Sequence, residues 1–175
     1  LCSHFELIRP HNAAPLALTV NMPGLHNAQN AVGAAALCAE LGISENAIVE
    51  GLAEFGGVGR RFSDLGDVRW SAGSARLIDD YGHHPTEVDV TLQAARDAFH
   101  DQRVVMVYQP HRFTRTRDHF DEFVSVLGEA QFLILLDVYP AGEPAIEGAD
   151  AQSLARAIRA RGVLEPVVVS DQRQL

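Results

Sequence analysis

The sequence contains no lysine, so all 14 of its basic residues are arginines. They stand against 23 acidic residues, which gives a formal net charge of −9. This balance disfavours nucleic-acid binding through a basic face, although clustered arginines can still bind phosphate or carboxylate groups. Without lysine there is also no Gly-x-x-x-x-Gly-Lys-Ser/Thr loop, the usual cradle for a nucleoside triphosphate.

Cysteines and long apolar runs are scarce as well. The two cysteines, Cys2 and Cys38, lie far apart, and we expect both to be reduced and structural in a cytoplasmic protein. No apolar run approaches the roughly 20 residues that span a bilayer, and no signal-peptide pattern opens the sequence. We therefore expect neither a membrane partner nor a nucleic-acid partner.

What the sequence does contain is an alternation of strand and helix patterns. Loose alternation predicts strands within 2–9 and at 16–20, followed by a helical hairpin of 27–41 and 44–55. A strand hairpin of 68–71 and 75–78 comes next. Helices at 86–99, 115–127 and 150–161 then alternate with strands at 103–108, 132–137 and 166–169. This order predicts an α/β fold with a mainly parallel sheet, right-handed crossovers and flanking helices.

A glycine-rich stretch, 56–59, divides the sequence into two predicted domains, 1–58 and 59–175. The first would contribute two strands of a sheet whose other strands are missing. The sequence also begins at Leu1 without a methionine, and its last strand pattern lacks a following helix and strand. We therefore expect a piece of a larger protein, with its final domain truncated.

Ionisable side chains concentrate where predicted strands end and helices begin. Residues 79–85 read Asp-Asp-Tyr-Gly-His-His-Pro, and residues 108–117 read Tyr-Gln-Pro-His-Arg-Phe-Thr-Arg-Thr-Arg. Parallel strands end at one sheet edge, where helix N-termini attract anions, so we expect the two motifs to share an edge. A plain helix-capping turn is the alternative for the first motif, and we assign that capping role to His84.

Two further stretches complete a resemblance. Residues 136–143 read Leu-Asp-Val-Tyr-Pro-Ala-Gly-Glu, and residues 24–31 read Gly-Leu-His-Asn-Ala-Gln-Asn-Ala. Together with the motifs above, they resemble the Mur ligase family over essentially the whole sequence. The resemblance implies a Rossmann-like C-terminal domain preceded by the end of the central ATPase domain.

The resemblance also implies a reaction. Its motifs look like those of the family branch that joins L-alanine to the carboxylate of UDP-N-acetylmuramate, a step of peptidoglycan precursor synthesis that serves cell-wall biogenesis, cell shape and division. ATP first phosphorylates that carboxylate to an acyl-phosphate. The implied cofactors are ATP and Mg²⁺, with the metal ligands mainly outside this sequence, and no metal ligand is assigned within it. The resemblance does not decide between a monomer and a homodimer.

Carried over residue by residue, the resemblance assigns a role to each motif position. His83 would lie near the γ-phosphate and the incoming alanine, with Tyr81 lining the same pocket. Arg112 and Arg115 would face the substrate carboxylate and the acyl-phosphate. The residues implied for nucleotide binding are His26, Asn27, Asn30, Arg61 and Asp80. From spacing alone, His26 or Asn27 could equally be a helix cap. For Tyr81 the alternative is packing, which is the commoner role of a tyrosine. We assign His111 and Phe113 to packing, and Asp79 to a structural role.

Two other functions compete with this interpretation. A sister ligase that recycles whole muropeptides would need a pocket for a tripeptide. A non-catalytic module could instead use the arginine edge to hold an anionic metabolite or nucleotide. Because the sequence lacks a triphosphate loop, we expect the isolated chain to be inactive under either ligase interpretation.

Overall fold

The structure, a computed structural model, describes residues 1–10, 14–162 and 164–170. The chain forms two compact units, Leu1–Tyr81 and Gly82–Leu175. The limits 1–58 and 59–175 are predicted boundaries between domains of the related proteins. The division into compact units uses a different criterion, so these limits stay a prediction. In the described ranges, no helix combines the length and apolar character needed to cross a membrane.

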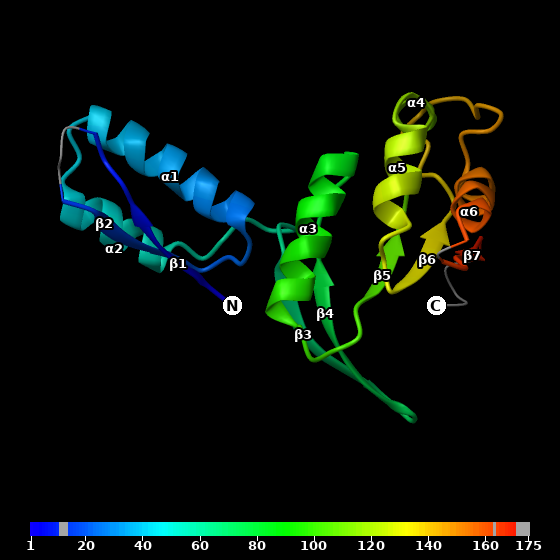
Figure 1. The fold of residues 1–175 in the computed structure, drawn as a ribbon, viewed down its shortest axis with the longest axis horizontal. Coiled ribbons are helices and arrows are strands. Elements are labelled where there is room, and N and C mark those ends of the chain that lie inside the picture. Colours follow the sequence, from blue (N-terminus) through cyan, green and yellow to red (C-terminus); the bar gives the residue numbers. More distant parts are fainter. Residues whose placement is uncertain (11–13, 163, 171–175) are drawn as a thin grey trace. The chain divides into compact units, whose positions relative to one another are not determined.

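The first unit begins with a two-stranded antiparallel sheet. It contains β1 (Ser3–Leu7) and β2 (Leu16–Val20), followed by α1 (Leu25–Glu40) and α2 (Glu45–Glu54) (Figure 1). Alternate residues of both strands face the two helices, so that Leu18 packs with Ala35 and Ile48. Ser44 caps α2, as predicted, by accepting a hydrogen bond from the backbone N–H of Ala47.

A separate hairpin completes this unit, formed by β3 (Ser63–Trp70) and β4 (Gly73–Asp79). Both strands are longer than the apolar patterns at 68–71 and 75–78 predicted. The ladder extends through polar residues because Gly66, at φ 85°, allows a bulge against β4. The Asp64 carboxylate accepts the Gly66 N–H at 3.0 Å and fixes this bulge.

The second unit has the predicted parallel α/β architecture. Its elements are α3 (Pro85–Ala98), β5 (Val105–Tyr108), α4 (Phe113–Asp118), α5 (Phe120–Leu127), β6 (Phe132–Leu136), α6 (Ala151–Ala160) and β7 (Val167–Val169). The strands pair in the order β5-β6-β7, and both pairings are parallel. Leu133 and Leu135 of β6 are fully buried with Phe123 and Leu127 of α5 and Leu154 of α6.

The opposite face of this sheet is exposed in the structure. Its outward side chains, at alternate positions from those in the core, are Val105, Val107 and Val167. The apolar run 167–169, which suggests a buried strand, is therefore buried on one face only, because only one face of β7 packs against helices.

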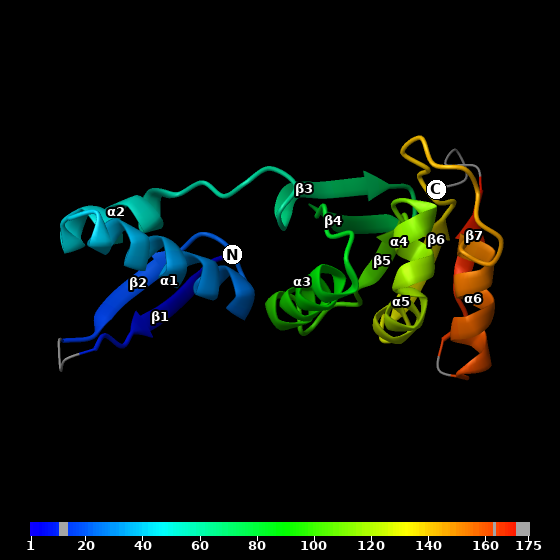
Figure 2. The same ribbon diagram turned by 90° about the horizontal axis from the view of Figure 1, so that it is seen from above.

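The predicted helix 115–127 is two helices. His119 leaves the helical conformation at φ −116° and ψ 27°, and it ends α4 and caps α5. The apolar spacing of α5 runs on without signalling this break. Figure 2 shows α4 and α5 as consecutive segments of the chain, seen from a second direction.

Candidate active site

The N-terminus of α3 is held by a capping box. His84 caps the helix as predicted, its Nδ1 accepting the Thr86 N–H at 3.3 Å. Glu87, three residues on, accepts the backbone N–H groups of His83 at 3.0 Å and His84 at 3.1 Å. The Glu87 carboxylate also lies 3.5 Å from His83 Nδ1. The sequence analysis did not single out Glu87, although a glutamate three residues after the capping His84 was the available signal.

The ends of β5 and β6, which carry the motifs 108–117 and 136–143, meet at one edge of the sheet. Arg112 N–H donates to the Tyr139 carbonyl, and Tyr139 N–H donates to the Pro110 carbonyl, each at 2.8 Å. These bonds hold Arg112 at φ 74°, a conformation that costs a non-glycine residue about 1–3 kcal/mol. Within the described chain, β4 pairs with β3 and belongs to neither of these ladders. Residues 108–117 and 136–143 thus share this sheet edge, whereas the strand that precedes residues 79–85 is not part of this sheet.

His111 lies at the centre of a cluster at this edge. Arg115 Nη1 lies 3.1 Å from the His111 carbonyl oxygen, to which it donates, and 3.2 Å from His111 Nδ1. The His83 ring lies 6.1 Å from that of His111, and the Tyr139 ring stacks on His111 at 5.3 Å. The packing role predicted for His111 is therefore incomplete, because the residue also connects His83 with Arg115.

The electrostatics of His111 favour its neutral form. Burial lowers its pKa most, and the cations Arg115 and Arg112 lower it further, while Glu143 acts in the opposite direction. Because a guanidinium can only donate, a hydrogen bond from Arg115 makes Nδ1 the acceptor. The proton of the neutral ring then lies on Nε2.

Glu143 is a neighbour of Arg112 that the sequence analysis did not assign to the site. Its carboxylate accepts from the Thr114 backbone N–H at 3.0 Å and from Thr114 Oγ1 at 2.8 Å, and these bonds lower its pKa. Arg112 Nη1 lies 3.7 Å from the same carboxylate. Glu143 occupies the Thr114 N–H at the start of α4, so this helix N–H group is not available to an anion. The 49% exposed side chain of Arg112 remains the accessible cation here.

Tyr108 lies beneath this edge with its hydroxyl buried. Among the described residues, none forms a hydrogen bond with that hydroxyl. Burial raises the pKa of Tyr108 strongly, so the phenol stays protonated. Its ring packs 5.8 Å from that of Phe123, which joins the site to the core.

In the first unit, three residues assigned to nucleotide binding lie close enough to interact. Burial lowers the pKa of His26, the Asp80 carboxylate raises it, and Arg61 lowers it. The Asp80 carboxylate accepts the Phe62 N–H at 2.8 Å, which also gives Asp80 a structural role in the chain turn.

The two asparagines differ in their surroundings. Asn27 is buried, and its Nδ2 donates to the Pro23 carbonyl at 2.7 Å. The N-cap of α1 is Gly24, without a side-chain cap hydrogen bond, so the alternative that His26 or Asn27 caps the helix is wrong. The Asn27 bond instead ties the first turn of α1 to the preceding residue Pro23. Asn30 is exposed on α1, one turn after His26.

Tyr81 is engaged by Arg60, whose guanidinium lies 4.7 Å from the centre of the tyrosine ring. Arg60 also pairs with Asp79 at 3.2 Å, which agrees with the structural role expected of Asp79. The Tyr81 side chain is still 42% exposed and can line a pocket.

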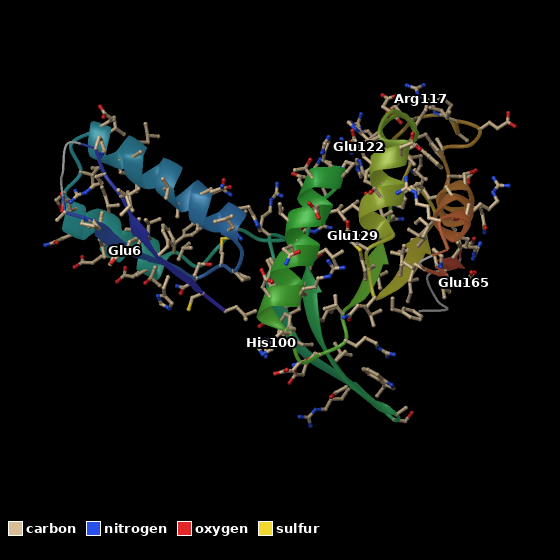
Figure 3. All side chains as sticks on the ribbon, viewed as in Figure 1. Glu6, His100, Arg117, Glu122, Glu129 and Glu165 are labelled. Atoms are coloured by element: carbon tan, nitrogen blue, oxygen red, sulfur yellow. The ribbon has the colours of Figure 1, made fainter. Side chains whose placement is uncertain are left out.

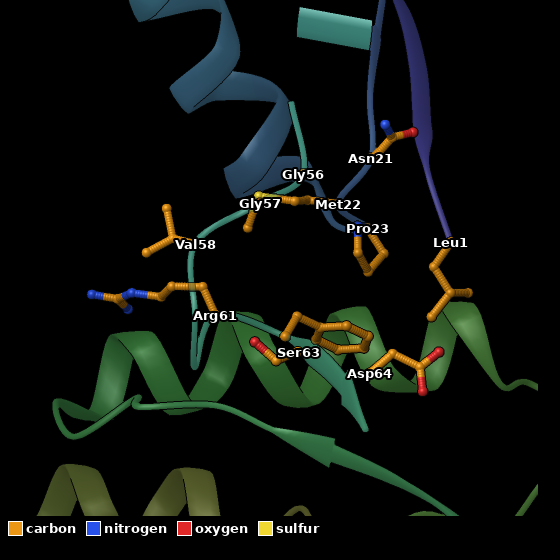
Figure 4. A pocket seen from close by; sticks show the side chains of 11 residues that line it. Leu1, Asn21, Met22, Pro23, Gly56, Gly57, Val58, Arg61, Ser63 and Asp64 are labelled. Atoms are coloured by element: carbon orange, nitrogen blue, oxygen red, sulfur yellow. The ribbon is translucent and has the colours of Figure 1, made fainter. Parts of the chain in front are cut away.

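A cavity of about 340 Å³ adjoins Arg61 (Figure 4). Met22, Pro23, Val58 and Phe62 supply apolar walls. Arg61 is the one cationic side chain among the eleven described residues that line it. Of the residues assigned to the nucleotide, Arg61 is the one among these lining residues, so the cavity does not bring the assigned set together.

Comparison with known proteins decides the family. The model of the Mur ligase glutamate ligase domain matches residues 60–175. The chain belongs to the Mur ligase family. Members of this family are ATP-dependent ligases, and the α/β fold described above is that of their C-terminal domain.

Solved structures of Mur ligases and related enzymes match nearly the whole chain. The UDP-N-acetylmuramate-alanine ligase MurC from Thermotoga maritima is 29% identical, with a TM-score of 0.69 over 89% of this chain and 32% of that one. The murein peptide ligase Mpl from Psychrobacter arcticus is 24% identical, with a TM-score of 0.63 over 98% and 35%. The folylpolyglutamate synthase from T. maritima is 21% identical, with a TM-score of 0.55 over 96% and 36%. The chain thus spans about a third of the length of each.

Proposed function

We propose that this chain is part of an ATP-dependent ligase that adds L-alanine to UDP-N-acetylmuramate in the cytoplasm. The observation that carries the proposal is the cluster of His83, His111 and Arg115 beside the exposed Arg112. These residues lie in the motifs by which the sequence resembles the alanine-adding branch. The 29% identity to a solved alanine ligase supports the same substrate.

The cluster suits acyl transfer through a phosphorylated carboxylate. ATP supplies the phosphoryl group that activates the muramate carboxylate. Arg112, anchored by its backbone and open to solvent, neutralises the charge on the carboxylate and then on the acyl-phosphate. Arg115, fixed by His111, supplies a second oriented cation. A guanidinium held in place needs no reorganisation as charge develops, which is the basis of its effect on rate.

His83 positions the incoming amine. Attack on the acyl carbon requires an uncharged amino group, forms the amide C–N bond and expels phosphate, and the ammonium proton must leave the nitrogen. His83 is held from both sides, by Glu87 through its backbone and by the neighbouring His111 ring. An imidazole in that position orients the amine and accepts its proton.

The nucleotide is assigned to the first unit. Asn30 presents an amide to the adenine, and His26 lies one turn away on the same helix. Asp80 offers a carboxylate oxygen to the ribose hydroxyls, and Arg61 is placed for a phosphate. Asn27 donates one of its amide hydrogens to Pro23 and thereby supports the start of α1. Mg²⁺ would be held mainly by residues outside this chain.

The muropeptide-recycling ligase is the second candidate, favoured by the fold similarity to Mpl. The two candidates differ in the nucleophile, which is free L-alanine in one and the amino end of a tripeptide in the other. In the ligase that contains this chain, ADP release with UDP-N-acetylmuramate should depend on L-alanine. Preference for the tripeptide would select the recycling enzyme, and no ligation with either would favour an anion-binding module. The isolated 175-residue chain should give no alanine-dependent phosphate release.

A further inference from the structure

Two histidines and a glutamate outside the proposed site lie together on the second unit. One potential ligand atom each from His84, His119 and Glu122 lies within 4.8 Å of the others. The two imidazole rings are edge to face, with centroids 4.5 Å apart. His119 Nδ1 lies 2.8 Å from Glu122 Oε2. None of the three has a role in the proposed ligation.

The backbone presets these side chains. The Nδ1 of His84 already accepts the Thr86 N–H, so Nε2 is the nitrogen that can bind an ion. His119 occupies the break between α4 and α5, where its backbone is not helical. Glu122 follows in the first turn of α5, where Figure 3 labels it.

The donor set selects the ion. Imidazole nitrogens and a carboxylate bind Zn²⁺ at about 2.0–2.2 Å, whereas Mg²⁺ and Ca²⁺ prefer oxygen ligands. Tetrahedral bonds of that length place ligand atoms about 3.4 Å apart, so the side chains of all three residues must rotate toward one another when the ion binds. Three protein ligands leave the fourth position to water.

We propose that His84, His119 and Glu122 form a Zn²⁺ site that fastens the N-terminus of α3 to the α4–α5 junction. The ion would hold together the two elements that carry His83 and Arg115.

Other potential Zn²⁺ ligands on the chain must be controlled for in the binding experiment. Cys2 Sγ lies 3.1 Å from His4 Nε2 on the first unit, and a thiolate with an imidazole also binds Zn²⁺. All titrations are therefore made in a Cys2→Ser background. The His83–His111 pair is a weaker competitor, because the adjacent Arg112 and Arg115 charges oppose a cation.

The test is calorimetric titration of the 175-residue chain with ZnCl₂ at pH 7.5. One ion should bind per chain, and Glu122→Gln should weaken binding about 10–100-fold. His119→Gln, which keeps a hydrogen-bonding amide but removes the imidazole, should weaken it on the order of 100-fold or more. The exposed His100→Gln is the matched control and should leave the affinity unchanged.

A second measurement keeps the proposal testable if His119→Gln unfolds. Co²⁺ bound at this site should give visible absorption of tetrahedral intensity, which the exposed Glu122→Gln change should diminish without loss of helical circular dichroism. No stoichiometric binding in the Cys2→Ser chain, or equal affinity in all three variants, would overturn the proposal.

Discussion

Two of the three sheets in the described ranges, β1–β2 and β5–β7, support their helices very differently. In β1–β2, small clusters around Leu18 and Val20 are shared between two strands and two helices. In β5–β7, one continuous core runs from Val88 on α3 through Leu133 on β6 to Ile158 on α6. A two-stranded sheet is marginally stable alone, whereas a larger core fixes its members cooperatively. The cluster around His111 therefore stands on the more rigid support, and the nucleotide-side residues of α1 on the weaker one.

The largest expected effect on the free energy of unfolding comes from shortening a buried leucine in the core around each of these two sheets. Leu154→Ala should cost about 3–5 kcal/mol of unfolding free energy, because the fully buried side chain leaves a cavity in a core that cannot collapse. Leu18→Ala, at 2% exposure, should cost about 2–3 kcal/mol, because its smaller surroundings can relax. Denaturant unfolding measures both, with the exposed Leu25→Ala as a control within about 0.5 kcal/mol. Equal costs for the two buried leucines would contradict the comparison.

Amide exchange should separate the same regions. The N–H groups of β1 and β2 should exchange on the order of 100-fold faster than those of β6, because their two-stranded sheet opens locally without unfolding the chain. Hydrogen-exchange mass spectrometry on the intact chain resolves the two segments. Uniformly slow exchange from Cys2 to Phe55 would show that the first unit is as cooperative as the second.

Glu143→Gln should destabilise the second unit by less than Leu154→Ala. The amide keeps an acceptor for Thr114 but loses the charge that interacts with the end of α4 and with Arg112. Because the pKa of Glu143 is lowered, its stabilisation is complete above its ordinary value of about 4.3 and is lost as the pH falls through the folded value. Thermal melts from pH 6 to pH 3 should therefore show a flatter acid decline for the variant. Parallel curves would mean that the charge contributes nothing.

The smallest change expected is a gain. Tyr108→Phe removes a buried hydroxyl without a partner among the described residues and should stabilise the second unit by about 1 kcal/mol. The ring contact with Phe123 is kept. A loss of stability in chemical denaturation would indicate that the hydroxyl does have a partner.

Local pattern predicted most elements, because capping and periodicity are short-range. Ser44, His84 and Pro85 mark helix starts that the structure confirms. The break at His119 and the wider hairpin around Gly66 could not be predicted, since they depend on side-chain and ladder contacts formed only in the folded chain.

Site residues that belong to local sequence motifs could be predicted, whereas contacts between residues distant in the sequence could not. His83, Arg112 and Arg115 were found from their motifs, while the link through His111 needed the observed ring contacts. Glu143 lies 29 positions from Thr114, and no local spacing signals such a cap. The assigned roles of all these residues stay predictions.

The central claim is that the second unit handles the acyl group while the first binds the nucleotide. Kinetics of Arg112→Lys and Asp80→Asn, in the ligase that contains this chain, test it most directly. Lysine keeps the charge of Arg112 but loses its planar fork, so kcat should fall on the order of 100-fold with an unchanged KM for ATP. Asp80→Asn keeps an acceptor for Phe62 and should mainly raise the KM for ATP, by about tenfold. A normal kcat for Arg112→Lys, or a defect confined to its KM for ATP, would contradict the account.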